Sequence, residues 1–321
     1  MKKHGIKTFV SLLMALTLLC GACLTASAEE KTYTVGILQL IQHPALDQAT
    51  QGFKDALTEK LGDRVVFDEG NASGDSNNCA QIASRLVSRP VDLIMANATP
   101  AMLACATATA DIPVLATSIT NYESAMEIEL TPEGATGMNV SGTSDLAPLD
   151  GQAAMIQELF PDAKTVGLIY CSAEPNSIFQ IKTIEGYLTA MGYECRRYGF
   201  NDSNDLASVV QSSTECDVLY IPTDNTAAGN TEAIANIVLP AKVPVVVGEE
   251  GICAGCGIAT LTISYYDIGY KTGEMAYDIL VNGADIASMP IAYAPQFTKK
   301  YNAANAAELN ITIPEGYLPI E

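Results

Sequence analysis

The chain has 321 residues, of which 17 are Lys or Arg and 37 are Asp or Glu, so its formal charge at pH 7 is −20. This excess of negative charge argues against binding to nucleic acid or to anionic lipid, because both carry negative charge themselves. A hydrophobic content of 48% over this length is sufficient for two hydrophobic cores and too large for one ordinary core.

The first 28 residues have the pattern of an export signal. Three lysines occur within the first seven residues, residues 9–19 form an apolar run too short to span a bilayer, and Ala26-Ser27-Ala28 has the small-x-small pattern of a peptidase site. Lipidation of Cys23 is a second interpretation of the same segment. We favour a signal peptide at residues 1–28 and, with either interpretation, expect an exported protein that works extracellularly or at the cell envelope.

The remaining chain alternates between strand and helix patterns, which is typical of a parallel sheet covered by helices on both faces. In chain order, the first half predicts a strand at 33–39, a helix at 44–61, a strand at 64–68, a helix at 78–88, a strand at 91–97, a helix at 100–110 and a strand at 112–117.

The second half repeats this order. The strand pattern at 164–170 matches the first strand, with Gly36 and Gly167 separated by 131 positions. Pro113 and Pro244, each between two β-branched residues, have the same separation, and Val91-Asp92-Leu93 is similarly matched by Cys216-Asp217-Val218. Three matches in one order predict a duplicated α/β lobe.

Two segments, 139–145 and 259–264, are predicted to cross between the halves, and a helix at 266–281 is predicted to return to the first one. The expected fold is therefore α/β, with two doubly wound, flavodoxin-like parallel sheets joined by a multi-strand hinge. The predicted lobes are 31–143 plus 265–289, and 144–264 plus 290–321.

Ligands of open parallel sheets bind beyond the carboxyl ends of the strands. The polar residues at these predicted ends are the candidate ligand-binding residues: Gln39, His43, Thr99, Ser118, Ser172, Glu174, Asn176, Ser177, Asp224, Asn225 and Glu249.

Several candidates also begin predicted helices, whose free N–H groups attract a carboxylate. This applies to Thr99 and to Asn176-Ser177, whereas Asp224 and Glu249 or Glu250 could hold an ammonium group. Such a combination suits an amino acid. The same residues are equally consistent with helix caps, an Asx turn and solvated loop charges.

The sequence offers little for catalysis. Beyond the signal only His43 remains among the histidines, and no Gly-x-Ser-x-Gly pattern occurs. We therefore expect no metal site, no cofactor and no enzymatic activity. Cys253 and Cys256 are the only close cysteine pair, and they predict a loop disulfide or two inert thiols.

Four segments, Val35–Asp47, Tyr170–Ser177, Ile221–Thr226 and Ile263–Gly269, resemble the ABC-transporter substrate-binding proteins of the tryptophan/tyrosine-binding type. The resemblance covers essentially the whole mature chain. It implies the type I periplasmic-binding architecture, an aromatic amino acid as ligand and an ABC permease as partner. The residues that it places near the ligand are Asp224, Asn225, Glu174, Asn176, Ser177 and Thr99.

One stretch departs from this family. Its members often carry an acidic residue and a proline after the fourth strand, where this chain has Ser118-Ile-Thr-Asn121. The departure bears on the identity of the ligand more than on the fold.

Taken together, the sequence predicts a monomeric extracytoplasmic solute-binding protein of an ABC importer, which binds its ligand between the lobes by hinge closure. Two alternatives remain. A sensory ligand-binding protein that reports to a membrane receptor has the same sequence features. An exported α/β hydrolase would need a nucleophile elbow and a second histidine.

Overall fold

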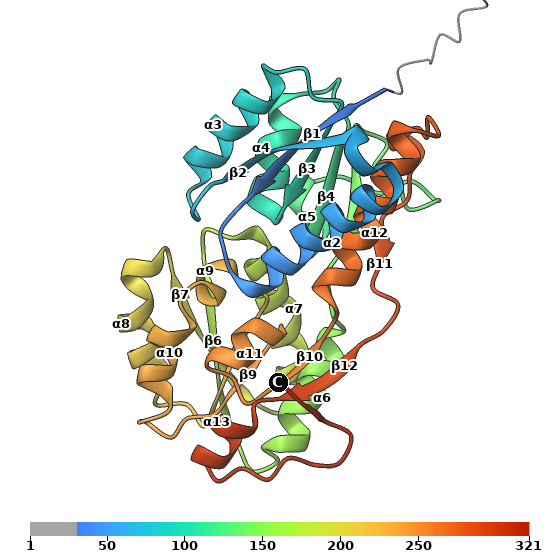
Figure 1. Ribbon diagram of the computed structural model, residues 1–321. Coiled ribbons are helices and arrows are strands. Elements are labelled where there is room, and N and C mark those ends of the chain that lie inside the picture. The colour runs from blue at the N-terminus through green and yellow to red at the C-terminus, as the bar shows by residue number, and fades with distance from the viewer. Residues whose placement is uncertain (1–30, 321) are drawn as a thin grey trace, which may run out of the picture. The chain divides into compact units, whose positions relative to one another are not determined.

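The computed structural model describes residues 31–320, which form two parallel α/β sheets with helices on both faces (Figure 1). The predicted signal peptide, residues 1–28, and Cys23 lie outside the described residues. Within residues 31–320, none of the helices combines the length and the apolar character needed to cross a membrane.

The first sheet has the strand order β11-β5-β4-β3-β1-β2, and all of its strand pairs are parallel. Its strands are β1 (Tyr33–Gln39), β2 (Val65–Asn71), β3 (Leu93–Asn97), β4 (Val114–Ile119), β5 (Val140–Ser144) and β11 (Ala292–Tyr293). The helices packed on this sheet or at its carboxyl edge are α2 (Pro44–Leu61), α3 (Ser76–Val87), α4 (Thr99–Ala108), α5 (Tyr122–Met126) and α12 (Tyr265–Leu280).

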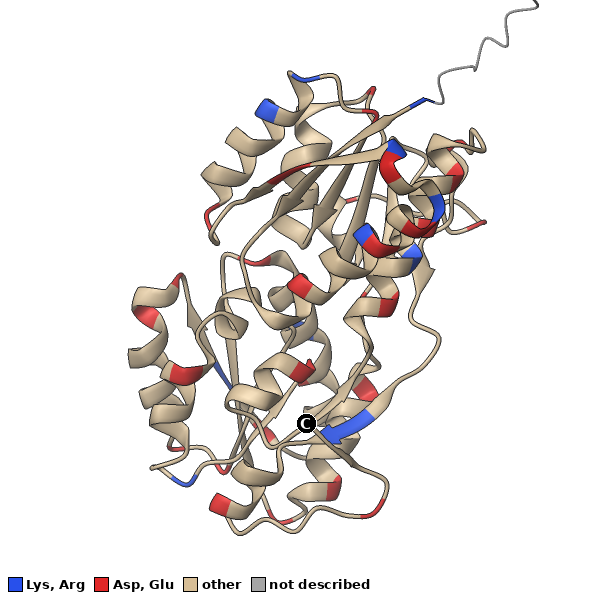
Figure 2. Cartoon of the chain, in the orientation of Figure 1, with Lys and Arg blue, Asp and Glu red and all other residues tan. Residues whose placement is uncertain are grey.

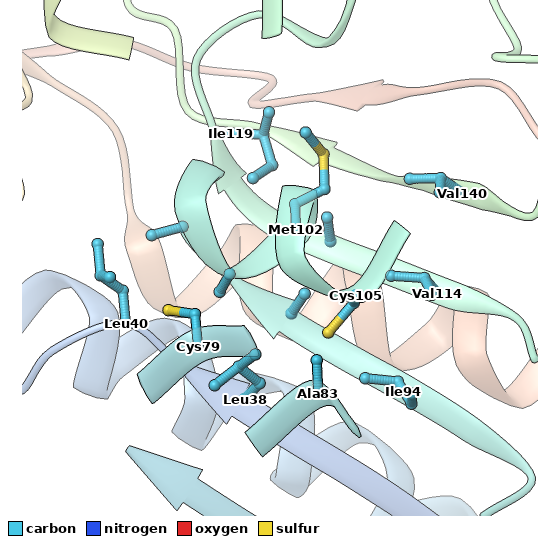
Figure 3. Packing of buried hydrophobic residues seen from close by; sticks show 14 of the residues in the cluster. Leu38, Leu40, Cys79, Ala83, Ile94, Met102, Cys105, Val114, Ile119 and Val140 are labelled. Atoms are coloured by element: carbon cyan, nitrogen blue, oxygen red, sulfur yellow. The ribbon is translucent and has the colours of Figure 1, made fainter. Parts of the chain in front are cut away.

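Alternation along the central strands divides the first core into two layers. On β3, Leu93 and Met95 face the layer of α2 and α12, whereas Ile94 and Ala96 face that of α3 and α4. This period of two is the geometry of a strand that is buried on both faces. Figure 3 shows the second layer, where Met102 of α4 packs among side chains of the sheet.

The second sheet has the order β13-β12-β10-β9-β8-β6-β7. Its strands are β6 (Thr165–Cys171), β7 (Glu194–Phe200), β8 (Val218–Ile221), β9 (Val245–Val247), β10 (Ala259–Thr262), β12 (Thr298–Tyr301) and β13 (Leu318–Pro319). The accompanying helices are α6 (Leu149–Leu159), α7 (Pro175–Ala190), α8 (Ser203–Ser213), α9 (Asn225–Ala228), α10 (Thr231–Val238), α11 (Glu250–Gly255) and α13 (Ala303–Glu308). Short 3-10 turns occupy Gly62–Arg64 and Ile286–Ser288.

The second core is layered in the same way. Leu219 and Ile221 of β8 face α8, α10 and α11, whereas Val218 and Tyr220 face α6 and α7. Only β12 runs antiparallel to its neighbour β10. The two lobes therefore confirm the predicted doubly wound α/β fold.

The duplication extends to individual hydrogen bonds. Asp92 accepts a bond from the Thr34 backbone N–H at 2.8 Å, and Asp217 accepts one from the Thr165 N–H at 2.9 Å. Thr34 and Thr165 lie near the start of the first strand of each lobe and are 131 positions apart. In both lobes a carboxylate before the third strand thus binds a backbone N–H that the sheet leaves free.

The chain passes between the sheets three times: between β5 and α6, between β10 and α12, and between β11 and β12. The predicted crossing segments 139–145 and 259–264 consist mainly of the sheet strands β5 and β10, so the crossings are the short stretches that follow them. The helix predicted at 266–281 packs on the first sheet, as expected. β11 belongs to the first sheet although it lies beyond residue 289, the predicted end of that lobe.

The contact between α2 and α12 needs glycine. A Cβ atom on Gly52 would lie 2.2 Å from the carbonyl oxygen of Tyr266, and one on Gly269 would lie 2.0 Å from the carbonyl oxygen of Ala49. The two helices therefore touch backbone to backbone, side by side in Figure 1, and no side chain separates them at these points.

Acidic residues are spread over both lobes, and basic residues are few (Figure 2). All seven cysteines in the described part of the chain are free. Cys253 of α11 and Cys256, which directly follows that helix, are both buried, and burial raises the pKa of each thiol. They thus match the prediction of inert thiols rather than of a loop disulfide.

Candidate functional site

A small buried cavity lies where the carboxyl ends of the strands of the two sheets meet. It offers about 10 Å³ to the centres of water-sized molecules, which is room for about one water. Its lining comes from both lobes and from the crossings: His43, Leu46, Ser118, Thr120, Asp145, Asn176, Thr223, Asp224, Asn225, Ala228, Glu249 and Tyr265.

Six of the candidate residues from the sequence come together in this lining. They are His43, Ser118, Asn176, Asp224, Asn225 and Glu249. The two sheets meet at their carboxyl edges, which is why residues separated by up to 206 positions share one cavity.

The other five candidates lie around the cavity but do not line it. Gln39 lines a separate recess beside β2, and its amide is bonded to Asp47 at 2.7 Å and to Thr50 at 2.6 Å. Thr99 is buried at the start of α4. Ser172 is exposed and donates to the carbonyl oxygen of Phe200 at 2.9 Å.

Glu174 and Ser177 act on the residues that line the cavity. Glu174 is the N-cap of α7, and its carboxylate accepts hydrogen bonds from the backbone N–H groups of Asn225 at 3.0 Å and of Thr226 at 2.9 Å. It also accepts from both of their side chains and from Asn176. Ser177 donates to Asp224 Oδ2 at 2.8 Å. Both residues hold the loop between β8 and α9 in place.

Asp224 is tied into the second lobe. Its carboxylate caps α9 through the Ala227 N–H at 2.9 Å and accepts the Cys171 N–H at 2.6 Å, in addition to the Ser177 hydroxyl. Burial, with the nearby charge of Glu174, raises the pKa of Asp224 to about 7. Three donors from its own lobe therefore already serve this carboxylate.

Glu249 has a similar role at α11. Its carboxylate accepts the backbone N–H of Gly251 at 2.6 Å and that of Ile252 at 2.5 Å, and burial raises its pKa to about 7. Glu250 lies outside the cavity and pairs with Lys300 at 2.6 Å. The N-termini of α9 and α11 are thus capped by carboxylates of the chain itself.

Asp145 is a cavity residue that the sequence reasoning missed. It directly follows β5, at the start of the first crossing, and accepts hydroxyl hydrogen bonds from Thr120 at 3.2 Å and from Tyr265 at 2.9 Å. Burial raises the pKa of Asp145 to about 6. The available signal was a carboxylate at the end of a β-branched run, which was interpreted only as a connection.

Two hydrogen bonds join the lobes beside the cavity. His43 Nε2 lies 3.3 Å from Asn225 Oδ1, and Gln180 Nε2 of α7 donates to Thr120 Oγ1 at 3.2 Å. Burial lowers the pKa of His43, so the ring is neutral near pH 7. Because the amide nitrogen of Asn225 donates to Glu174, Asn225 Oδ1 is the acceptor, and the His43 proton is assigned to Nε2.

Several buried polar atoms of the lining have no partner. They are His43 Nδ1, Ser118 Oγ and Asn176 Oδ1, and the side chain of each residue is at least nine-tenths buried. Buried polar groups are rarely left without a hydrogen bond. Two of these atoms can only accept, because His43 holds its proton at Nε2 and the Asn176 amide nitrogen donates elsewhere.

The backbone of the first lobe is strained next to the cavity. Ala98 has φ 86° and Ser118 has φ 58°, values that L-residues with a side chain rarely adopt. Ala98 directly follows β3, and Ser118 lies in β4, where the pairing with β5 shifts register between Ala116 and Ile119. Ser118, at this irregularity in β4, lines the cavity.

Two α/β lobes, three crossings and a polar cavity between facing strand ends are the features of a type I solute-binding protein. A family model described as ABC transporter substrate binding protein matches residues 34–319, so the chain belongs to this family. Proteins of the family serve transport by binding and are not enzymes, and they work outside the cytoplasm. Within residues 31–320, no group of His, Cys, Asp and Glu side chains is arranged to hold a metal ion.

Relatives with known ligands are among the similar proteins. The chain is 35% identical over 267 residues to a tyrosine-binding protein from Clostridioides difficile (strain R20291), covering 82% of this chain and 76% of the relative. It is also similar to the ABC domain from Streptococcus pneumoniae solved in complex with L-Trp, with 32% identity and a TM-score of 0.85. That match covers 90% of this chain and 100% of the other.

A third similar protein was solved without ligand. It is the open form of a substrate-binding protein with adhesive properties from Clostridium difficile. The identity is 33% and the TM-score is 0.68, with 90% of this chain and 99% of the other covered.

Proposed function

We propose that this protein binds an aromatic amino acid in the cavity between its lobes and delivers it to an ABC permease. Two relatives support the ligand class, since one is a tyrosine-binding protein and the other was solved with L-Trp. The cavity supports it independently. It combines buried carboxylates with the apolar side chains of Leu46 and Ala228 and the ring of Tyr265, as a molecule with a charged and an apolar end requires.

The observation that carries the proposal is the set of unpartnered polar atoms in a cavity shared by both lobes. His43 Nδ1, Ser118 Oγ and Asn176 Oδ1 are buried without a hydrogen bond, which costs about 1–3 kcal/mol for each group. A polar ligand that bonds to them removes this cost only when both lobes contact it. The same residues therefore link binding to closure.

The similarity scores support a closed arrangement. At nearly equal identity, this structure is more similar to the L-Trp complex, with a TM-score of 0.85, than to the ligand-free open form, with 0.68. The bond between His43 and Asn225 across the lobes is consistent with closure. Because the cavity has room for about one water, an amino acid enters by hinge opening and displaces side chains of the lining.

The same proposal includes export and a membrane partner. We infer that residues 1–28 are a signal peptide, with lipidation at Cys23 as the alternative processing, and that the protein acts as a monomer. Import requires a permease, and loss of amino-acid uptake on deletion of the gene would support import rather than sensing. Unchanged uptake combined with a lost response to the amino acid would favour the sensory alternative.

A thermal-shift and calorimetric screen tests the ligand class. The purified protein is compared with L-tyrosine, L-tryptophan and L-phenylalanine, with L-leucine and galactose as controls. A ligand at 100 times its Kd adds about 2.7 kcal/mol to the free energy of unfolding, which raises the Tm by several degrees. A rise with L-leucine alone would contradict the aromatic assignment, and no rise with any amino acid would contradict the proposal as a whole.

A further inference from the structure

We propose that Asp145 binds the ammonium group of the ligand and thereby restricts the site to molecules that carry a primary amine. This inference rests on the proposed function only in that the ligand is taken to be an amino acid. It assigns the ammonium group to a residue of the first crossing rather than to the carboxylates of the second lobe.

The three carboxylates of the cavity differ in what already neutralises them. Asp224 and Glu249 accept backbone N–H groups at the N-termini of α9 and α11, where the partial positive charge of a helix end favours an anion. Asp145 caps no helix, and its side-chain partners are the neutral hydroxyls of Thr120 and Tyr265. Asp145 is therefore the carboxylate with the greatest need for a cation from outside.

The protein supplies no such cation. Lys and Arg are absent from the cavity lining, and no ion pair within residues 31–320 involves Asp145. Its side chain is only 5% exposed, and an isolated carboxylate is costly at such a depth unless it is paired or protonated. A bound ammonium group would provide the missing charge.

The neighbouring atoms match an ammonium group rather than a hydroxyl. His43 Nδ1 and Asn176 Oδ1 are unpartnered acceptors in the same lining, and their residues are only 6% and 5% exposed. An ammonium group has three N–H donors and no acceptor. It is the ligand group that can serve a carboxylate and two neutral acceptors together.

Asp145 also lies in a connection between the two lobes rather than in the body of either lobe. It begins the first crossing, and its partner Tyr265 follows the second crossing at the start of α12. A residue at the hinge moves least when the lobes turn. The ammonium group would therefore be bound at the pivot in the open form, before the lobes close on the rest of the ligand.

The test compares ligands with and without the amine. Calorimetric Kd values are measured for L-tyrosine and for 3-(4-hydroxyphenyl)propanoate, which lacks only the amino group, with the wild-type protein, Asp145→Asn and Asp145→Glu. A hydrogen bond between charged groups contributes about 1.5–3 kcal/mol, which corresponds to roughly 10- to 100-fold in Kd. We expect the wild type to prefer tyrosine by at least this factor, and Asp145→Asn to lose the preference.

The control variant is Glu250→Gln, which removes a neighbouring carboxylate that pairs with Lys300 outside the cavity. It should keep the wild-type preference. Asp145→Glu keeps the charge and should retain a preference for the amine with weaker binding, which distinguishes lost recognition from a folding defect. A wild-type preference that persists in folded Asp145→Asn would overturn the assignment.

Failure of the proposed function has a different signature. If the wild type binds a non-aromatic amino acid, the aromatic assignment is wrong, and the same variants are judged with that amino acid and its deamino analogue. If the wild type binds the deamino compound as tightly as the amino acid, the role of Asp145 is overturned while ligand capture stands. Binding of no amino acid and no amine would overturn both.

Discussion

The two lobes repeat each other in strands and helices, yet they differ at corresponding strand ends. Ser118 occupies the position in β4 that Glu249 occupies after β9, 131 places later. Thr99 at the start of α4 likewise corresponds to Asp224 at the start of α9. In the first lobe these positions carry buried hydroxyls without a partner. In the second lobe they carry buried carboxylates bonded to helix N-termini.

A third pair follows the same rule. His43 and Glu174, also 131 places apart, each precede a proline at the start of a helix. Burial lowers the pKa of His43 and so keeps it neutral, whereas Glu174 accepts hydrogen bonds from the α9 region.

This comparison shows which residues kept the same role in both lobes and which residues took on different roles. Asp92 and Asp217 keep one role in both lobes because the first strand of each sheet needs an acceptor for a free N–H group. The residues at the carboxyl ends of the strands do not share such a backbone requirement. The loops of the second lobe are organised by their own carboxylates, and the first lobe leaves polar atoms open to a ligand.

The largest expected effect is that of Glu174→Ala. The change leaves the backbone N–H groups of Asn225 and Thr226 without the acceptor that they now have. We expect the free energy of unfolding to fall by about 3 kcal/mol, because buried donors lose a charged acceptor, as measured by urea denaturation. Glu250→Ala, which removes a partly exposed ion pair with Lys300, should cost less than about 1 kcal/mol. An equal loss of unfolding free energy in both variants would contradict the view that Glu174 holds the loop before α9 in place and that Glu250 does not.

The second largest expected effect is that of pH, which acts on stability and on binding in opposite directions. Burial raises the pKa of Asp145 to about 6, and those of Asp224 and Glu249 to about 7, whereas unfolded carboxyls titrate near 4. Between these values the folded protein holds more protons than the unfolded chain. These groups therefore lower the stability of the ligand-free protein as the pH rises from about 4 to 7.

Binding of an amine should show the opposite trend, because it requires the ionised carboxylate. We expect the Kd for the amino acid to be roughly tenfold higher at pH 5 than at pH 8, since pH 5 lies one unit below the pKa of Asp145. Of the other titratable groups of the lining, Asp224 and Glu249 accept backbone N–H groups of their own lobe, and burial lowers the pKa of His43. Calorimetry at four pH values measures the change, and a constant Kd would show that no cavity carboxylate changes its protonation on binding.

Ser118→Ala should separate stability from binding. The hydroxyl is buried without a partner, so its removal should leave the free energy of unfolding unchanged or raise it by up to about 1 kcal/mol. The affinity for the ligand should fall several-fold. Thr99→Val is the matched control, because its hydroxyl is also unpartnered but does not line the cavity. A lower stability of both variants would indicate that these hydroxyls have partners within the protein.

Asp217→Asn is expected to have the smallest effect. Its carboxylate accepts the Lys164 and Thr165 N–H groups, and these bonds hold its pKa below the usual range. The site is exposed, so the loss should be at most about 1 kcal/mol, and ligand affinity should not change. Because the pKa is lowered, this contribution is present at neutral pH and is lost in acid. Asp92→Asn in the first lobe should behave similarly, and a change in affinity would show coupling to the cavity.

Much of the fold could be predicted because its signals are local and strong. The pattern at 44–61 has the bounds of α2, and the repeat of Gly36 and Pro113 at Gly167 and Pro244 predicted the second lobe. β11 was not predicted, since a strand of two residues has no periodicity. Its place in the sheet depends on a neighbour, β5, that lies some 150 residues earlier.

The site was predicted less completely than the fold. The rule that ligands bind at strand ends brought His43 and Glu249 to one cavity, but the same rule also selected Gln39, whose side chain is bonded to Asp47 and Thr50 of α2. The hydrogen bonds of Glu174 with the N–H groups of Asn225 and Thr226 depend on how two loops of the second lobe meet, and no local pattern indicates that. Asp145 was missed because its segment was interpreted as a connection rather than as a strand end.

The backbone contact between α2 and α12 also constrains how the lobes can turn. Gly52 and Gly269 bring the helices together without room for a methyl group, so α12 packs directly against the backbone of α2. We expect α12 to move together with the first lobe when the lobes open and close. Torsion at this crossing is confined to Ile263 and Ser264, the two residues that join β10 to α12. Each opening and closing would then follow nearly the same arc.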